Sequence, residues 1–236
     1  MAAQEAIAQN LANASTTGYK QDVPQFESFQ SMLLDRMSGA ASDQVGTLGT
    51  GVTLQDFATD FAPGAMQATG NNLDVALTGD AYLTVSTPQG VRYTRDGSLT
   101  RDANGTLVQS GTMAPVLDSS GKSITIPATA KNIQISPQGT ISADGATVAQ
   151  LGLVGLDSTS GALKVGDNQY SATKPSTPSA GSTVQQGYLE TSNVNIVKQM
   201  VAMITAQRIY ETNSKMLQAE DQATSKAVNT VASVTA

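Results

Sequence analysis

The segment Gly187-Tyr-Leu-Glu-Thr-Ser-Asn-Val-Asn-Ile-Val-Lys-Gln-Met200, together with the residues that follow it to Ala236, decides the fold. Residues 188–236 contain no glycine and no proline. Because these two residues interrupt helices most strongly, the segment predicts one unbroken helix. Side-chain acceptors suited to a helix N-cap stand just before its apolar series, at Ser192, Asn193 and Asn195.

The apolar series of this helix predicts a surface that packs against other helices. Ile196, Met203, Tyr210 and Leu217 recur every seven residues, and Val197, Met200 and Ile204 widen the stripe. A helix of about 38 residues would extend roughly 57 Å, which is longer than one domain can cover. Most of this face therefore needs a partner from elsewhere.

The start of the chain offers such a partner. Residues 1–17 also lack glycine and proline, and Ala3, Ile7, Leu11 and Ala14 fall on one helical face. All 21 glycines and all 8 prolines lie between Gly18 and Gly187, so two helical ends enclose a turn-rich middle. We expect the following residues to form a helical seam between subunits: Ile7, Leu11, Val197, Met200, Met203, Ile204, Tyr210 and Leu217.

The middle of the chain, from about Gly51 to Gly187, predicts an antiparallel β domain built of hairpins. Short runs alternate at period two, as in Tyr82-Leu-Thr-Val and Val91-Arg-Tyr-Thr. Turn dipeptides separate them: Gln89-Gly90, Asp96-Gly97, Asn104-Gly105, Ser120-Gly121, Gln138-Gly139, Asp144-Gly145 and Ser160-Gly161. The predicted class is α+β, an all-β central domain with terminal helices that form a discontinuous, coiled-coil-like helical domain.

Between the first helix and the β domain lies a segment of different composition. Residues 24–37 carry Phe26, Phe29 and Met32 and suit either a short helix or an extended arm, and Ser38–Gly51 is a loop by composition. The predicted domains are residues 1–20 with 190–236 (helical), 21–60 (arm and flexible loop) and 61–189 (β domain).

Composition removes several classes of function. The chain has no cysteine and no histidine, which excludes disulfides, thiol catalysis, Ser-His catalysis and nearly all zinc, copper or haem sites. A net charge of −6 without any basic cluster argues against nucleic acid as a partner. The N-terminus lacks the features of a secretory signal, and no apolar run is long enough to span a membrane.

The remaining polar motifs favour structure over chemistry. Asp102-Ala-Asn-Gly resembles the opening of a calcium loop, but the later acidic ligand is missing and a hairpin turn is the preferred interpretation. Arg92, Arg95, Asp96 and Arg101 are expected on solvated strand faces. No glycine-rich phosphate loop is present, so we expect no enzyme activity, no cofactor and no metal.

Five ordered motifs resemble the bacterial flagellar hook–basal-body family of axial rod and hook proteins. They are Asn10-Leu-Ala-Asn-Ala-Ser-Thr-Thr-Gly-Tyr-Lys, the run from Gly64 to Asp80, Tyr93-Thr-Arg-Asp-Gly-Ser-Leu, Gly187-Tyr-Leu-Glu-Thr-Ser-Asn-Val-Asn, and the run from Met203 to Lys215. The matching motif residues at the two ends are Asn10, Leu11, Asn13, Thr17, Gly18, Tyr19, Gly187, Leu189, Ser192, Asn193 and Asn195. Two departures stand out: the family usually has further residues before the position of Met1, and its Gly-Asp-Gly-Phe-Phe reads Gly79-Asp-Ala-Tyr-Leu here.

The resemblance implies a structural axial subunit of the flagellar basal-body rod, proximal or distal, that polymerises through its helical ends into a hollow, torque-transmitting tube. It implies copies of the same chain and neighbouring rod and hook proteins as partners. It also implies export through the flagellar type III apparatus without a cleaved signal, to the basal body outside the cytoplasmic membrane, with no membrane insertion. The alternatives are a flagellar hook subunit, or a secreted adhesin or carbohydrate-binding β domain on a helical stalk, with a hydrolase third.

Overall fold

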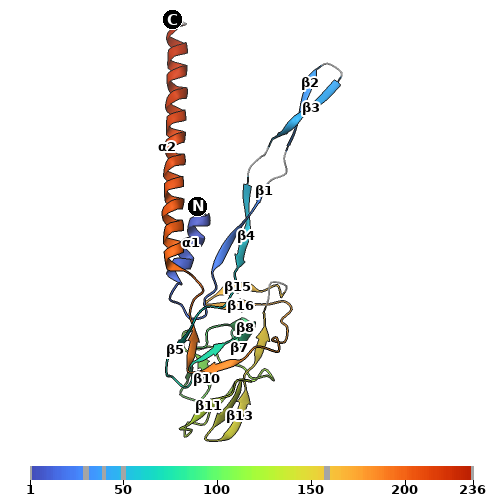
Figure 1. Cartoon of the computed structure of the whole chain (residues 1–236), viewed down its shortest axis with the longest axis vertical. Helices are drawn as coiled ribbons and strands as arrows, with labels where there is room; N and C mark the ends of the chain where they lie inside the picture. The colour runs from blue at the N-terminus through green and yellow to red at the C-terminus, as the bar shows by residue number, and fades with distance from the viewer. Residues whose placement is uncertain (1, 29–31, 39–40, 49–51, 157–159, 235–236) are drawn as a thin grey trace. The chain divides into compact units, whose positions relative to one another are not determined.

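The computed structural model describes residues 2–28, 32–38, 41–48, 52–156 and 160–234 (Figure 1). The chain divides into two compact units. One comprises Met1–Leu11, Pro24–Phe57 and Asn195–Ala236, and the other comprises Ala12–Val23 and Ala58–Val194. They are called the helical unit and the β unit below.

Two helices belong to the helical unit, α1 (Ala2–Ala12) and α2 (Ile196–Val234). The prediction of one unbroken C-terminal helix is confirmed, since α2 runs for 39 residues (Figure 1). Asn195 caps it, because its Oδ1 accepts a hydrogen bond from the backbone N of Lys198 at 3.0 Å. Two residues one turn apart, Ala6 and Asn10, are buried in α1.

Strands also occur in the region predicted as arm and loop. β1 (Asp22–Ser28) pairs with β4 (Val52–Thr59), and β2 (Met32–Ser38) pairs antiparallel with β3 (Ala41–Leu48). The extended arm is therefore the correct alternative for the described part of residues 24–37. The loop prediction for Ser38–Gly51 is wrong over Ala41–Leu48, which forms strand β3. Backbone hydrogen bonds to β2 hold this strand, and they do not depend on its loop-like side-chain composition. Residues 39–40 and 49–51 lie outside the described residues.

The β unit consists of short antiparallel strands, as the hairpin pattern predicts. Its largest sheet has the order β14-β7-β8-β16-β15, formed by Leu153–Gly155, Ala81–Thr87, Gly90–Thr94, Gln169–Ser171 and Leu163–Gly166. A second sheet has the order β11-β12-β13, formed by Ile133–Ile135, Thr140–Ala143 and Ala146–Gln150. Three pairs complete the unit: β9 with β10 (Leu99–Arg101 and Leu107–Gln109), β6 with β17 (Val75–Leu77 and Val184–Gln186), and β5 with β18 (Met66–Ala68 and Tyr188–Glu190).

Aliphatic side chains fill the main core of the β unit, as the lack of tryptophan suggests. Leu77, Leu83, Val85, Leu107 and Ile141 are fully buried there. A smaller aromatic cluster joins Tyr82 and Tyr170, whose ring centroids lie 5.6 Å apart, with Phe61 packed against both.

The turn predictions are confirmed at most positions and wrong at one. Asp144 and Gly145 both adopt positive φ between β12 and β13, as a type I′ hairpin requires. Asp102 closes the hairpin between β9 and β10, its Oδ1 accepting from the backbone N of Asn104 and of Thr106. Gly97 instead lies against Val75, whose carbonyl oxygen would stand 1.7 Å from a Cβ, so glycine there permits a close backbone approach and no hairpin.

Candidate functional site

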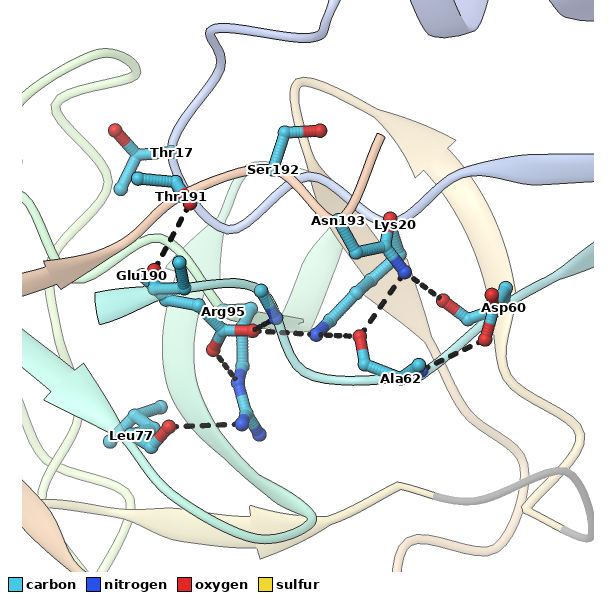
Figure 2. A network of polar contacts seen from close by, with 12 residues as sticks. Thr17, Lys20, Asp60, Ala62, Leu77, Arg95, Glu190, Thr191, Ser192 and Asn193 are labelled. Atoms are coloured by element: carbon cyan, nitrogen blue, oxygen red, sulfur yellow. Dashed lines mark hydrogen bonds and ion pairs between the residues drawn. The ribbon is translucent and has the colours of Figure 1, made fainter. Parts of the chain in front are cut away.

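A buried carboxylate, Glu190 at the end of β18, organises the polar interior of the β unit (Figure 2). Its Oε1 accepts hydrogen bonds from Lys20 Nζ at 2.7 Å and from the backbone N of Gly64 at 2.8 Å. Its Oε2 accepts from Arg95 Nε. Lys20, Arg95 and Glu190, called the ionic network below, are each 1–2% exposed. One carboxylate therefore forms ion pairs with two buried cations.

Arg95 contradicts its prediction as a solvated strand residue. Its Nη1 donates to the carbonyl oxygen of Ala81 at 2.6 Å, and its Nη2 donates to that of Leu77 at 2.9 Å. The guanidinium also lies 5.3 Å from the ring centroid of Tyr82. Alternation along a strand predicts on which face of the sheet a side chain lies, but not whether that face is exposed to solvent. Segments distant in the sequence cover the side chain of Arg95.

The electrostatics of the ionic network depend on this pairing. Burial, and to a smaller extent the neighbouring Arg95 charge, lower the pKa of Lys20 and outweigh the opposing effect of Glu190. Burial also disfavours the charged form of Glu190, but the adjacent Arg95 and Lys20 cations outweigh it and hold its pKa below the usual value. Since a buried charge without a partner is costly, removing any one member of the network should destabilise the folded chain.

Asn193 joins three segments of the β unit without any charge. Its Oδ1 accepts from the backbone N of Gln21 at 2.8 Å, and its Nδ2 donates to the carbonyl oxygens of Asp60 and Ala62 at 2.9 and 3.1 Å. Its backbone N donates to the carbonyl oxygen of Tyr19 at 3.2 Å. The Asp60 carboxylate accepts from the Ala62 backbone N and from Gln21 Nε2, and these two bonds lower its pKa.

Gly18 permits this arrangement through its backbone conformation. It has φ of +65°, and a Cβ at this position would stand 2.6 Å from the backbone carbon of Arg95. Its N donates to the carbonyl oxygen of Glu190 at 2.7 Å. A side chain at Gly18 would therefore push the N-terminal segment away from Arg95.

Tyr19 and Lys164 hold the same segment from the side of β15. Tyr19 is 3% exposed, and Lys164 Nζ lies 3.8 Å from the centroid of its ring. Lys164 Nζ also donates to the carbonyl oxygen of Lys20 at 2.8 Å and pairs with Asp22 at 2.9 Å. Burial, and secondly the Asp22 charge, raise the pKa of Tyr19 to about 12.

The structure brings several of the motif residues from the two ends together in the β unit. Gly18 and Tyr19 contact Glu190 and Asn193, and the carbonyl oxygen of Thr17 accepts from Asn168 Nδ2 at 2.6 Å. Gly187 has φ of +79° and donates to the carbonyl oxygen of Asp74. Leu189 pairs with Gln67 between β18 and β5, Ser192 Oγ accepts from the backbone N of Val194, and Asn13 Oδ1 accepts from Thr16 Oγ1. Asn10, Leu11 and Asn195 lie in the helical unit.

The predicted seam residues lie on the two helices of the helical unit. Val197 is 71% exposed and Ile204 is 51% exposed, and Met200, Tyr210 and Leu217 are likewise exposed. Met203 is half-buried, as are Ile7 and Leu11 of α1. Other large apolar residues of α2 are exposed as well: Ile196, Val201, Ile209, Met216 and Val228. Much of the apolar surface of α2 is thus uncovered in the single chain.

Sequence reasoning missed the ionic network. Lys20, Arg95 and Glu190 each stand inside one of the quoted motifs, and this shared feature is the signal that could have identified them. Among the residues that the structure describes, no group of three acidic residues could hold a metal ion, and no helix is long and apolar enough to cross a membrane.

Three protein-family models match the chain. They are described as flagella basal body rod protein (residues 1–20), flagellar hook protein FlgE/F/G D1 domain (residues 76–143), and flagellar basal body rod FlgEFG protein C-terminal (residues 185–230). The ionic network takes one residue from each matched segment: Lys20, Arg95 and Glu190.

Curated relatives cover nearly all of the chain. The flagellar basal-body rod protein FlgG of Bacillus subtilis (strain 168) is 33% identical over 243 residues, covering 95% of this chain and 92% of the relative. FlgG of Buchnera aphidicola subsp. Acyrthosiphon pisum is 36% identical over 237 residues, covering 92% and 89%. The rod protein FlgF of Caulobacter vibrioides is 36% identical over 214 residues, covering 89% and 84%.

Proposed function

Because the chain belongs to the family of flagellar basal-body rod proteins, we propose that it polymerises into the rod through its two terminal helices. It is a structural subunit of the bacterial flagellar basal body and serves motility. The family also implies assembly with other rod and hook proteins. The proposal concerns which surface makes these contacts.

The exposed apolar surface of α2 carries the proposal. Residues such as Val197, Ile204 and Leu217 are more than half exposed on a helix of 39 residues, roughly 58 Å long. Burying one such side chain is worth about 1.5–3 kcal/mol. An apolar surface of this length is typical of a helix that meets partners, and other copies of this chain offer the same helices.

We further propose that the assembled helices form a hollow tube that transmits torque. The chain would reach it by export through the flagellar type III apparatus without a cleaved signal. The lack of cysteine supports this route, since a chain exported unfolded forms no wrong disulfides in an oxidising space.

A hook subunit is the second candidate, because one matching family model also covers the hook protein FlgE. Two observations favour the rod. The relatives described above are named rod proteins, and the chain covers 84–92% of their length.

Ile204→Asp tests the proposed assembly surface. In the monomer Ile204 is half exposed, so the substitution should change stability by no more than about 0.5 kcal/mol. In the polymer it would bury an unpaired carboxylate in every copy, at several kcal/mol each. We expect the variant to melt like the wild type by circular dichroism and to fail to restore motility in a strain lacking the native protein.

Thr205→Asp is the matched control. It also adds one negative charge to an exposed position of α2, but Thr205 lies about 100° around the helix from Ile204 and about 120° from Leu217, away from the predicted seam residues. It should restore motility. If Ile204→Asp restores motility equally well, this face of α2 is not the assembly surface.

A further inference from the structure

The chain passes four times between the helical unit and the β unit. The crossings follow Leu11, Val23, Phe57 and Val194. Within the β unit, the segments next to these crossings are residues 12–23, 58–64 and 187–194. The contacts among these three segments decide whether the chain crossings open together or independently of one another.

Two residues of the last segment hold both of the others. Glu190 binds Lys20 of the first segment and the backbone N of Gly64 of the second. Asn193 binds the backbone N of Gln21 in the first segment and the carbonyl oxygens of Asp60 and Ala62 in the second. Figure 2 shows Lys20 of the first segment, Asp60 and Ala62 of the second, and Glu190 and Asn193 of the last converging.

Direct contacts between the segments close the arrangement. The backbone N of Asp60 donates to the carbonyl oxygen of Gln21 at 2.9 Å, and Lys20 Nζ donates to that of Ala62 at 2.8 Å. Gly64 lies so close to the last segment that a Cβ would stand 1.9 Å from the carbonyl oxygen of Thr191. Each segment therefore contacts both of the others.

We propose that Glu190 and Asn193 form a clamp that ties the β-unit ends of the four chain crossings together, so that they open and close as one unit. Glu190 also anchors the clamp to the core, through Arg95 and its bonds to Ala81 and Leu77. Asn193 fixes the relative positions of the three segments, because its side-chain amide accepts one hydrogen bond from a backbone N and donates two to backbone carbonyl oxygens. The inference goes beyond the proposed function, since it concerns the single chain and stands whether or not the helices assemble.

Hydrogen exchange on the full-length monomer tests the clamp, with Asn193→Ala as the perturbation. Gly18 and Gly64 are the diagnostic amides, because their acceptors are on Glu190 and neither bonds to Asn193. If the crossings open as one unit, both amides should exchange at least tenfold faster in the variant. Leu107 and Val116, whose backbone bonds lie within the main core, should change less than twofold.

Ser192→Ala is the matched control, because Ser192 neighbours Asn193 but its hydroxyl accepts a local hydrogen bond from the backbone N of Val194. It should leave Gly18 and Gly64 unchanged. A rise confined to Gln21, which simply loses its acceptor, would show that the crossings are independent and overturn the proposal. So would an equal rise at Leu107 and Val116, which would mean general destabilisation.

Lys20→Met provides a second route if Asn193→Ala does not fold. This variant keeps the Arg95–Glu190 pair and removes the bonds of Lys20 to Glu190 and Ala62. We expect at least tenfold faster exchange at Asp60 and Gln21, whose backbone amides donate to the carbonyl oxygen of Gln21 and to Asn193 Oδ1 and not to any group that the substitution removes. Unchanged exchange at these amides would contradict a clamp.

Discussion

Replacing Glu190 with glutamine removes one charge and keeps the shape of the side chain. The variant leaves Lys20 and Arg95 in the interior, 1% and 2% exposed, without their shared carboxylate. The amide nitrogen would in addition point a donor at a cation, because two of the three bonds to Glu190 come from Lys20 and Arg95. Both effects act against the folded state.

Breaking a buried ion pair from one side costs about 3–5 kcal/mol, because a charge is left uncompensated. For a chain of this length, 1 kcal/mol shifts the melting temperature by about 2–4 °C. Glu190→Gln should therefore lower the melting temperature by about 6–20 °C. Lys20→Met should cost less, since one cation and one anion remain paired.

Circular dichroism in the β-sheet region, followed during heating and during urea titration, measures the effect. Glu211→Gln is the control, because it makes the same chemical change at an exposed position of α2 and should stay within about 0.5 kcal/mol. A Glu190→Gln variant that melts within about 1 °C of this control would refute the reasoning. A Lys20→Met variant less stable than Glu190→Gln would do so as well.

Two further predictions follow from the same region. The pKa of Glu190 in the folded chain lies below its ordinary value of 4.5. The stability that this carboxylate contributes is therefore present above pH 4.5 and is lost as the pH falls through the folded pKa. In urea titrations between about pH 5 and pH 3, the wild type should lose stability more steeply than Glu190→Gln. Gly18→Ala places a Cβ 2.6 Å from the backbone of Arg95 in a residue with positive φ, and should lower the free energy of unfolding by more than about 2 kcal/mol. Gly111→Ala is the control, because no atom lies within 4 Å of its added Cβ; thermal melting should show a change of no more than about 1 kcal/mol.

The sequence predicts those helices and turns that are determined by residues close together in the chain. The lack of glycine and proline predicts α2, and alternation with Asp144-Gly145 predicts the hairpin of β12 and β13. The short strand β6 does not alternate between buried and exposed residues, because both of its faces are covered and Val75, Ala76 and Leu77 are all buried.

The parts that could not be predicted depend on distant segments. Arg95 lies beside a strand that alternates like its neighbours, and its burial depends on Glu190, 95 residues further along the chain. Lys20 looks like a polar residue after a helix, and its partner is 170 residues away. The composition of Ala41–Leu48 suggests a loop, but pairing with β2 makes it a strand. The interface role of the seam residues stays a prediction, since the structure contains one chain.

The position of Glu190 in the chain has a consequence for timing. A ribosome makes the N-terminus first, so Arg95 waits through 95 further residues for its carboxylate, which takes about 5–20 s at ordinary rates of synthesis. Over that interval two cations destined for the interior have no anion to accompany them, and the long loops between the partners slow closure further. The β unit can therefore complete its fold only after Glu190 has been synthesised. On the export route that we propose, the domain would lock only after Glu190 has left the channel.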